Sequence, residues 1–228
     1  MHLNLKAKRQ TSRAPASLEA TREQLLAAAS VVFAETGFRD ATVREICERA
    51  GANIAAVNYH FGDKETLYSE VLKTAYARAH EKYPADFGLP SNAPGEQRLF
   101  AFVRAFLLRI FDEGPHSHHG KLMAREMVDP TAALDAIVRE GIGQQAATIS
   151  KIVRELFDGK ASEELVRRCG MSVVSQVLFY HHCRPVISRL FPDLRFEAKQ
   201  IDQLAEHITR FSLAGIRAMK NEAKPRKK

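Results

Sequence analysis

The side chains best suited to chemistry lie between Thr42 and Lys64, and their chemistry is that of contact with a nucleic acid. Thr42 and Arg44 offer a hydroxyl and a guanidinium beside the free N–H groups of an expected helix start, a combination that holds phosphate. Asn58 carries an amide that can pair bidentately with an adenine edge. Lys64 supplies a cation for a further phosphate. This stretch therefore predicts contact with DNA.

Two short helices are expected to position these side chains. Apolar residues recur at helical spacing over residues 43–50, and Thr42 with Glu45 forms the T-x-x-E capping box that starts this helix. Gly51 ends it, and Asn53 caps a second short helix. A capped helix, a glycine turn and another capped helix match a helix-turn-helix, which inserts its second helix into the major groove. An ordinary helical hairpin in a bundle is the alternative that the spacing leaves open.

The second short helix, residues 54–61, is expected to have a core face and a DNA face. Val57 and Phe61 are four residues apart and should be buried. The exposed side should carry residues small or polar enough to meet base edges. These are Asn53, Ala55, Ala56 and Asn58.

Helical spacing recurs along the whole chain, and no convincing alternating strand pattern interrupts it. Proline and glycine crowd residues 84–95, which predicts a loop between two parts. Beyond this loop, helical segments are expected near residues 96–112, 117–128, 131–157, 162–183 and 200–220. The fold class predicted is all-α, with about nine helices. The G-x-G-x-x-A run from Gly141 to Ala146 has no strand before it, so its glycines are expected at a kink or a close contact within a helix.

The stretch from Thr42 to Tyr68 resembles the DNA-binding module of TetR-family transcriptional regulators, and the helix expected before it lies in the family's order. The resemblance implies an all-helical homodimer that binds a palindromic operator and that a small-molecule effector releases. Activation of transcription is the alternative to repression. Tyr59 and His60 resemble the family's pair that reaches the DNA backbone or the groove wall. Residues 119–127 resemble one subgroup with a poorly characterised ligand domain.

The recognition segment departs from the family pattern at four consecutive positions. Many members have Ser, Lys, Gly and Thr where this chain has Asn53, Ile54, Ala55 and Ala56. The departures remove a cation and a hydroxyl. Phosphate anchoring is therefore expected to depend more on Arg44, Lys64 and the N-terminal tail.

The formal net charge of +7 is concentrated at the two ends of the chain. Residues 1–16 hold four basic side chains and no acidic one, and residues 217–228 hold six basic side chains against Glu222. The expected domains are a basic disordered tail (1–16), a helix-turn-helix domain (17–80, with its core at 42–61), a ligand-sensing and dimerisation domain (81–220) and a basic tail (221–228). The first tail can track phosphates or enter a minor groove.

The rear part is expected to provide a dimer interface and an effector pocket. A recognition helix of this length reads only a few base pairs, so useful affinity requires two copies. Apolar stripes on the two long helices predict the interface: Leu165, Cys169, Val173, Val177, Ile201, Leu204, Ile208, Phe211 and Gly215. Adaptable and polar side chains predict the pocket lining: Phe102, Phe106, Met123, Arg125, Met127, Gln176, Phe179, Tyr180 and His182.

Two other functions stay open at this point. His116, His119, His181 and His182 suggest a metal-sensing regulator or a metal-dependent enzyme, although adjacent histidines on a helix point about 100° apart. An architectural protein that binds DNA through its tails, without sequence preference, is the second. The usual short signatures of hydrolases and nucleotide-binding enzymes are absent, so no catalysis and no cofactor are expected. Three cysteines without a CxxC pair, no secretory signal and no membrane-length apolar stretch favour a cytoplasmic protein.

Overall fold

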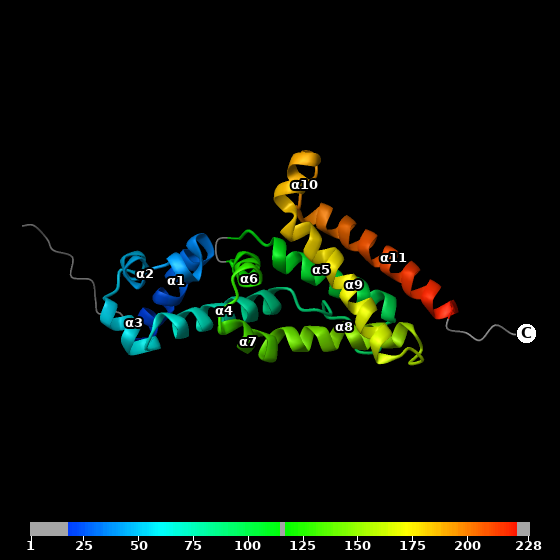
Figure 1. Ribbon diagram of the computed structural model, residues 1–228, viewed down its shortest axis with the longest axis horizontal. Coiled ribbons are helices and arrows are strands. Elements are labelled where there is room, and N and C mark those ends of the chain that lie inside the picture. The colour runs from blue at the N-terminus through cyan, green and yellow to red at the C-terminus, as the bar shows by residue number, and fades with distance from the viewer. Residues whose placement is uncertain (1–17, 115–116, 223–228) are drawn as a thin grey trace, which may run out of the picture.

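Every regular element in the described part of the chain, residues 18–114 and 117–222 of the computed structural model, is helical. The all-α prediction is confirmed. The first four helices gather at one end of an elongated molecule, and α4 extends from them to the remaining helices (Figure 1). The predicted tail 1–16, residues 223–228 of the second basic tail and His116 lie outside the described residues.

The front helices begin and end where local chemistry predicts. They are α1 (Leu18–Asp40), α2 (Val43–Ala50), α3 (Ile54–Phe61) and α4 (Lys64–Lys82). The Thr42 side chain accepts a hydrogen bond from the N–H of Glu45 at 3.1 Å, and Asn53 Oδ1 accepts one from Ala55 at 2.9 Å. Gly51 ends α2 in the left-handed region, with φ 65°. These interactions span two or three residues, so they follow directly from the sequence.

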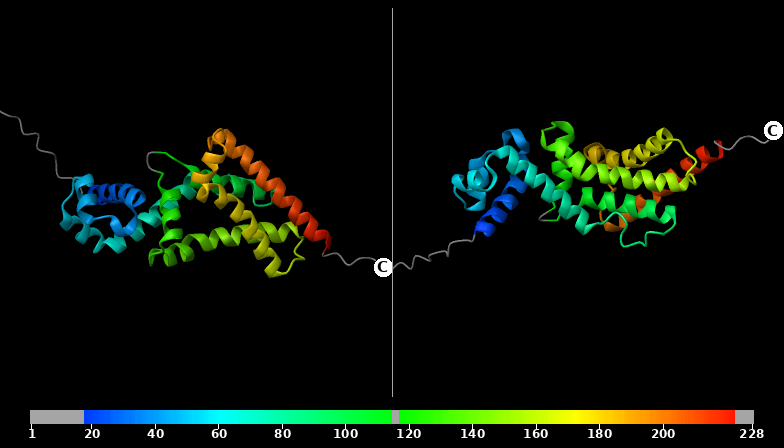
Figure 2. Two further views of the ribbon diagram at one scale, coloured as in Figure 1. Left: turned by 45° about the horizontal axis from the view of Figure 1, so that its top comes forward. Right: turned by 90° about the horizontal axis from the view of Figure 1, so that it is seen from below.

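The rear helices are longer. They are α5 (Gly95–Phe111), α6 (His119–Val128), α7 (Ala133–Ile137), the π-helical turn η1 (Val138–Ile142), α8 (Gly143–Leu156), α9 (Glu163–His182), α10 (Arg184–Leu190) and α11 (Ala198–Glu222). The segment expected at 131–157 is divided by the π-turn, and α10 is a helix that the apolar pattern did not indicate. In Figure 2, α9 and α11 are the two long helices that meet near α10.

Gly141 lies at a close contact, as its position within a helical pattern indicated. A Cβ atom there would come within 2.5 Å of the Tyr76 ring on α4. The absence of a side chain therefore lets the π-turn lie directly against α4.

Two apolar cores support the molecule. The front core includes Leu25, Phe33, Ile46, Val57 and Phe61, and it continues into the rear part through Leu122, Ala133 and Ile137. The rear core joins α5, α8, α9 and α11. Because α6 and α7 contribute to the front core, movement of these helices must affect the packing of the front helices.

Among the described residues, no helix is both long enough and apolar enough to cross a membrane.

Candidate DNA-binding surface and internal cavity

The recognition helix α3 turns Val57 and Phe61 inward and most of its small or polar side chains outward, and Ile54 at its start is also exposed. Val57 is fully buried, and Phe61 is almost so. Outside lie Asn53, Ala55, Asn58 and Tyr59. Ala56, also predicted to meet DNA, is half-buried and packs against the front core. The exposed face therefore offers one amide within the helix, at Asn58, and one large aromatic ring, at Tyr59.

Thr42 and Arg44 lie on the exposed start of α2. The Arg44 side chain is 81% exposed and pairs with Glu48 one turn further along, with 2.9 Å between Nε and Oε1. An exposed pair of this kind contributes at most about 1 kcal/mol. Arg44 can therefore exchange Glu48 for a DNA phosphate at little cost.

Lys64 has a structural role that the sequence did not reveal. Its Nζ donates hydrogen bonds to the carbonyl oxygens of Ala41, at 3.0 Å, and Arg39, at 3.4 Å. It also lies 4.6 Å from the centre of the Phe38 ring. These contacts occupy the cation at the end of α1. Tyr59 is 71% exposed, and its ring meets the edge of His60, with 5.0 Å between ring centres.

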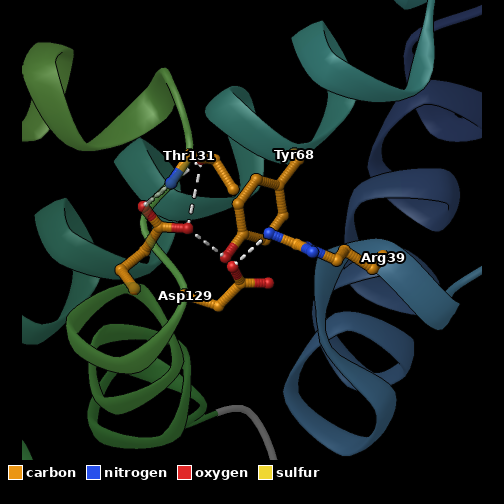
Figure 3. Close-up of polar contacts among 5 residues, drawn as sticks. Arg39, Tyr68, Asp129 and Thr131 are labelled. Carbon is orange, nitrogen blue, oxygen red and sulfur yellow. Dashed lines mark hydrogen bonds and ion pairs between the residues drawn. The ribbon is translucent and has the colours of Figure 1, made fainter.

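A buried hydrogen-bond group joins α4 of the front part to α6 of the rear part (Figure 3). Tyr68 donates to Glu126 Oε1 at 2.7 Å, and the backbone N–H of Thr131 donates to Glu126 Oε2 at 3.2 Å. Glu126 is only 1% exposed. Burial and the adjacent carboxylate raise the pKa of Tyr68, so its hydroxyl keeps its proton and donates. Sequence reasoning missed this pair, whose members are 58 positions apart.

Arg125 of α6 forms hydrogen bonds with the backbone near the end of α1. The guanidinium donates to the carbonyl oxygens of Ala34, at 3.0 Å, and of Glu35. Gly37, with φ 86°, is a kink that interrupts α1 beside this contact. Arg39 and Asp129 add an ion pair of 2.6 Å. The predicted role of Arg125 in the effector pocket is therefore replaced by a contact between the two parts of the molecule.

A cavity of about 790 Å³ lies among α6, α8 and α9. Four predicted pocket residues line it: Phe106, Met123, Met127 and His182. Phe102 is instead fully buried in the rear core. Gln176, Phe179 and Tyr180 lie on a separate groove of about 380 Å³ between α9 and α11. Most of the remaining lining comes from α8 and α9 residues that the sequence did not place in the pocket.

The predicted dimer stripes divide between the core and the surface. Five members, Cys169, Val173, Val177, Ile201 and Ile208, are at most 4% exposed within one chain, so a second chain cannot reach them. Leu165 and Leu204 are half-buried. Phe211 and Gly215 are exposed, and a Cβ at Gly215 would meet open space. The apolar spacing therefore identified the inner face of these helices, because burial within the chain has the same periodicity.

The histidines do not assemble a metal site in the described part of the chain, where no group of three or more His, Cys, Asp or Glu side chains is arranged to hold an ion. His119 and His181 both lie in the cavity wall. His182 lines the cavity next to His181, and His116 falls outside the described residues.

Two family models match this chain. The model for bacterial regulatory proteins of the tetR family matches residues 25–71. The model for the C-terminal domain of the HTH-type transcriptional dual regulator CecR matches residues 95–216, more than half of the chain. The chain belongs to the TetR family of transcriptional regulators. It is a helix-turn-helix DNA-binding regulator with a CecR-type C-terminal domain, and this family is not one of enzymes.

Curated TetR-family relatives include two with long matches. The dual regulator CecR of Shigella flexneri is 31% identical over 152 residues, which cover 59% of this chain and 64% of CecR. The repressor NicS of Pseudomonas putida is 27% identical over 211 residues, which cover 86% of this chain and 92% of NicS.

Solved structures share the fold. A TetR-like regulator from Rhodococcus sp. RHA1 superposes with a TM-score of 0.62 at 17% identity, covering 89% of this chain and all of the other. AibR, solved with isovaleryl coenzyme A and operator DNA, superposes with a TM-score of 0.64 at 15% identity, covering 84% and 97% of the two chains.

Proposed function

We propose that this regulator is a homodimeric repressor that binds a palindromic operator through α3 and leaves it when a small-molecule effector fills the cavity of α6, α8 and α9. The observation that carries this proposal is the position of α6. Met123 and Met127 line the cavity, whereas Leu122 and Glu126 of the same helix contact the front part. Occupancy of the cavity and the position of the front part are therefore linked through one helix.

The link is mechanical because the contacts on both sides of α6 are close. An effector that displaces Met123 or Met127 moves the backbone that carries Glu126, and Glu126 holds Tyr68 of α4. Since α4 follows α3 directly, its movement changes the spacing of the two recognition helices in a dimer. Coupling between sites of this kind is typically about 1–3 kcal/mol.

The face proposed for the dimer is the outer side of α9 and α11. Phe179 is 56% exposed and Phe211 is 66% exposed, so each helix presents a large apolar side chain to solvent. Gln176 of α9 donates a 3.0 Å hydrogen bond to Ser212 of α11, so the two helices present one surface. On α11 the exposed residues His207, Phe211, Ala214 and Ala218 follow helical spacing. A second copy would cover this stripe.

The relatives support the proposal by analogy. NicS is a repressor, and AibR has been solved with both an acyl coenzyme A and operator DNA. Activation of transcription, in place of repression, is the alternative effect on the regulated gene. CecR is described as a dual regulator.

The experiment that tests the proposal is selection of bound fragments from random and genomic DNA, followed by a screen for small molecules that release the selected sequence. A palindromic motif, protected at much lower concentration than random DNA, is the expected result. Binding that depends only on salt and not on sequence would instead favour the architectural alternative.

A further inference from the structure

Arg109, in the middle of α5, is a buried cation without a counter-charge. The residue is 1% exposed. Among the described residues, its Nε and Nη2 atoms have no hydrogen-bond partner, and no carboxylate is among the groups whose charge acts on it. Buried side-chain charges are normally paired and fully hydrogen-bonded, so this arrangement requires an explanation.

The guanidinium lines a small cavity that shares His119 with the large one. Its Nη1 contacts Nε2 of His80, whose ring stacks on Tyr76 with 3.9 Å between ring centres. Tyr76 and His119 line the large cavity of 790 Å³, and Arg109 and His119 line a smaller one of about 220 Å³. His119 therefore borders both the cavity that contains the cation and the large cavity.

The neighbouring histidines do not neutralise Arg109. His80 Nδ1 lies 2.9 Å from the carbonyl oxygen of Tyr76 and donates to it, which leaves Nε2 to accept from Arg109. Burial lowers the pKa of His80 to about 4 and that of His119 to about 3, so both are neutral at pH 7. Burial also lowers the pKa of Arg109, but only to about 10, so it remains charged.

The other charged side chains of the small cavity do not neutralise Arg109 either. Arg78 and Lys82 add two cations, and the carboxylate of Asp112 is already bound by Lys82 at 2.6 Å and by Ser117. The remaining field in this cavity is positive. Two buried N–H groups of Arg109 and the unpartnered Nδ1 of His119 supply donors for an anion.

We propose that the effector of this regulator is an amphiphile with a carboxylate, whose oxygens accept hydrogen bonds from Arg109 and His119 while its apolar body fills the large cavity. This inference rests on the proposed function, because it names the class of molecule for the same cavity. Phe106, Met123 and Met127 line the large cavity, so its occupant is expected to have an apolar body. A neutral molecule would leave the buried cation without a partner.

The test measures how well two matched compounds displace a fluorescent apolar probe, N-phenyl-1-naphthylamine, from the full-length protein. The compounds are decanoate and 1-decanol, which share a chain and differ in charge. Wild-type protein is expected to bind decanoate at least about 10-fold more tightly than 1-decanol, since charge-assisted hydrogen bonds are the strong ones. Arg109→Gln is expected to remove this preference and leave 1-decanol binding unchanged.

Arg104→Gln is the matched control, because Arg104 is on the same helix but pairs with Asp202 at 2.7 Å. It should keep the preference for decanoate. Unchanged 1-decanol binding in Arg109→Gln shows that the cavity is intact, and Arg109→Met repeats the test with a different side chain. The inference is overturned if wild-type protein binds the two compounds equally, or if the preference for decanoate survives both Arg109 variants. Either result leaves the proposed function standing. Failure of wild-type protein to bind the probe counts against the cavity and so against the proposed function as well.

Discussion

The hydroxyl of Tyr68 on α4 donates a hydrogen bond of 2.7 Å to the buried carboxylate of Glu126 on α6. Tyr68 belongs to the front core, where its ring meets the edge of Phe33 with 4.8 Å between ring centres. Glu126 belongs to the helix that forms one wall of the large cavity. This bond therefore connects the packing of the DNA-binding part with the part that is proposed to sense the effector.

Replacing Tyr68 by phenylalanine is expected to reduce the free energy of unfolding by about 1.5–3 kcal/mol, since a buried hydrogen bond to a charged group is lost. Urea denaturation followed by circular dichroism measures the change. Tyr83→Phe is the control, because Tyr83 is a half-buried residue at the end of α4. A loss no larger than that of the control would show that Glu126 finds another partner in solution.

Asn58→Ala is expected to reduce discrimination between the selected operator and random DNA by about 1–3 kcal/mol, because Asn58 is the exposed amide of the recognition helix. Binding to random DNA should change little, since that binding depends on phosphate contacts. Gel-shift titrations with both DNAs measure the difference. Lys121→Ala, on an exposed position of α6, is the control. An unchanged ratio of the two affinities would remove Asn58 from base recognition.

The sequence was sufficient for the front helices because their start and stop signals are local. Thr42, Gly51 and Asn53 act on residues at most four positions away. The group at Glu126 depends instead on residues from α4 and the α6–α7 connection, so no local pattern could indicate it. The signal that was available is an acidic side chain at a position where α6 is buried.

Arg109 illustrates a second limit. Arg104 and Arg109 both interrupt the apolar run of α5, and no sequence pattern distinguishes one from the other. In the structure Arg104 pairs with Asp202, whereas Arg109 is enclosed among histidines. Which of the two is left without a carboxylate depends on helices that approach from distant parts of the chain. Part of the predicted interface stripe is buried for a related reason, since Val173 and Ile208 face the core of their own chain.

Phe179→Asp with Phe211→Glu is expected to convert a dimer into a monomer, because the exposed apolar face of α9 and α11 would then carry charge. Sedimentation velocity measures the mass at micromolar concentration. Val128→Asp is the control, since Val128 is 87% exposed and lies at the end of α6. A double variant that keeps the mass of the wild-type assembly would show that the subunits meet through another surface.

The neutral histidines around Arg109 give the stability of the protein a defined dependence on pH. Burial lowers the pKa of His119 to about 3, and burial with nearby positive charge lowers the pKa of His80 and His181 to about 4. An unfolded chain binds these protons near pH 6.5, so it holds more protons than the folded chain below that pH. These histidines therefore do not reduce the free energy of unfolding above about pH 6.5, and they reduce it progressively as the pH decreases toward 4.

Urea denaturation at several values between pH 7 and pH 4.5 measures this fall. His119 alone, which is 8% exposed, accounts for up to about 1.4 kcal/mol per pH unit. His119→Gln is expected to reduce the slope by that amount, whatever its effect on stability at pH 7. His207→Gln, which removes an exposed histidine of α11, serves as the control. Asp63 and Asp112, whose hydrogen bonds lower their pKa, lose their contribution only below about pH 4, outside this window. An equal slope in wild-type protein and His119→Gln would mean that His119 is already protonated in the folded state, and that the field around Arg109 is less positive than the geometry indicates.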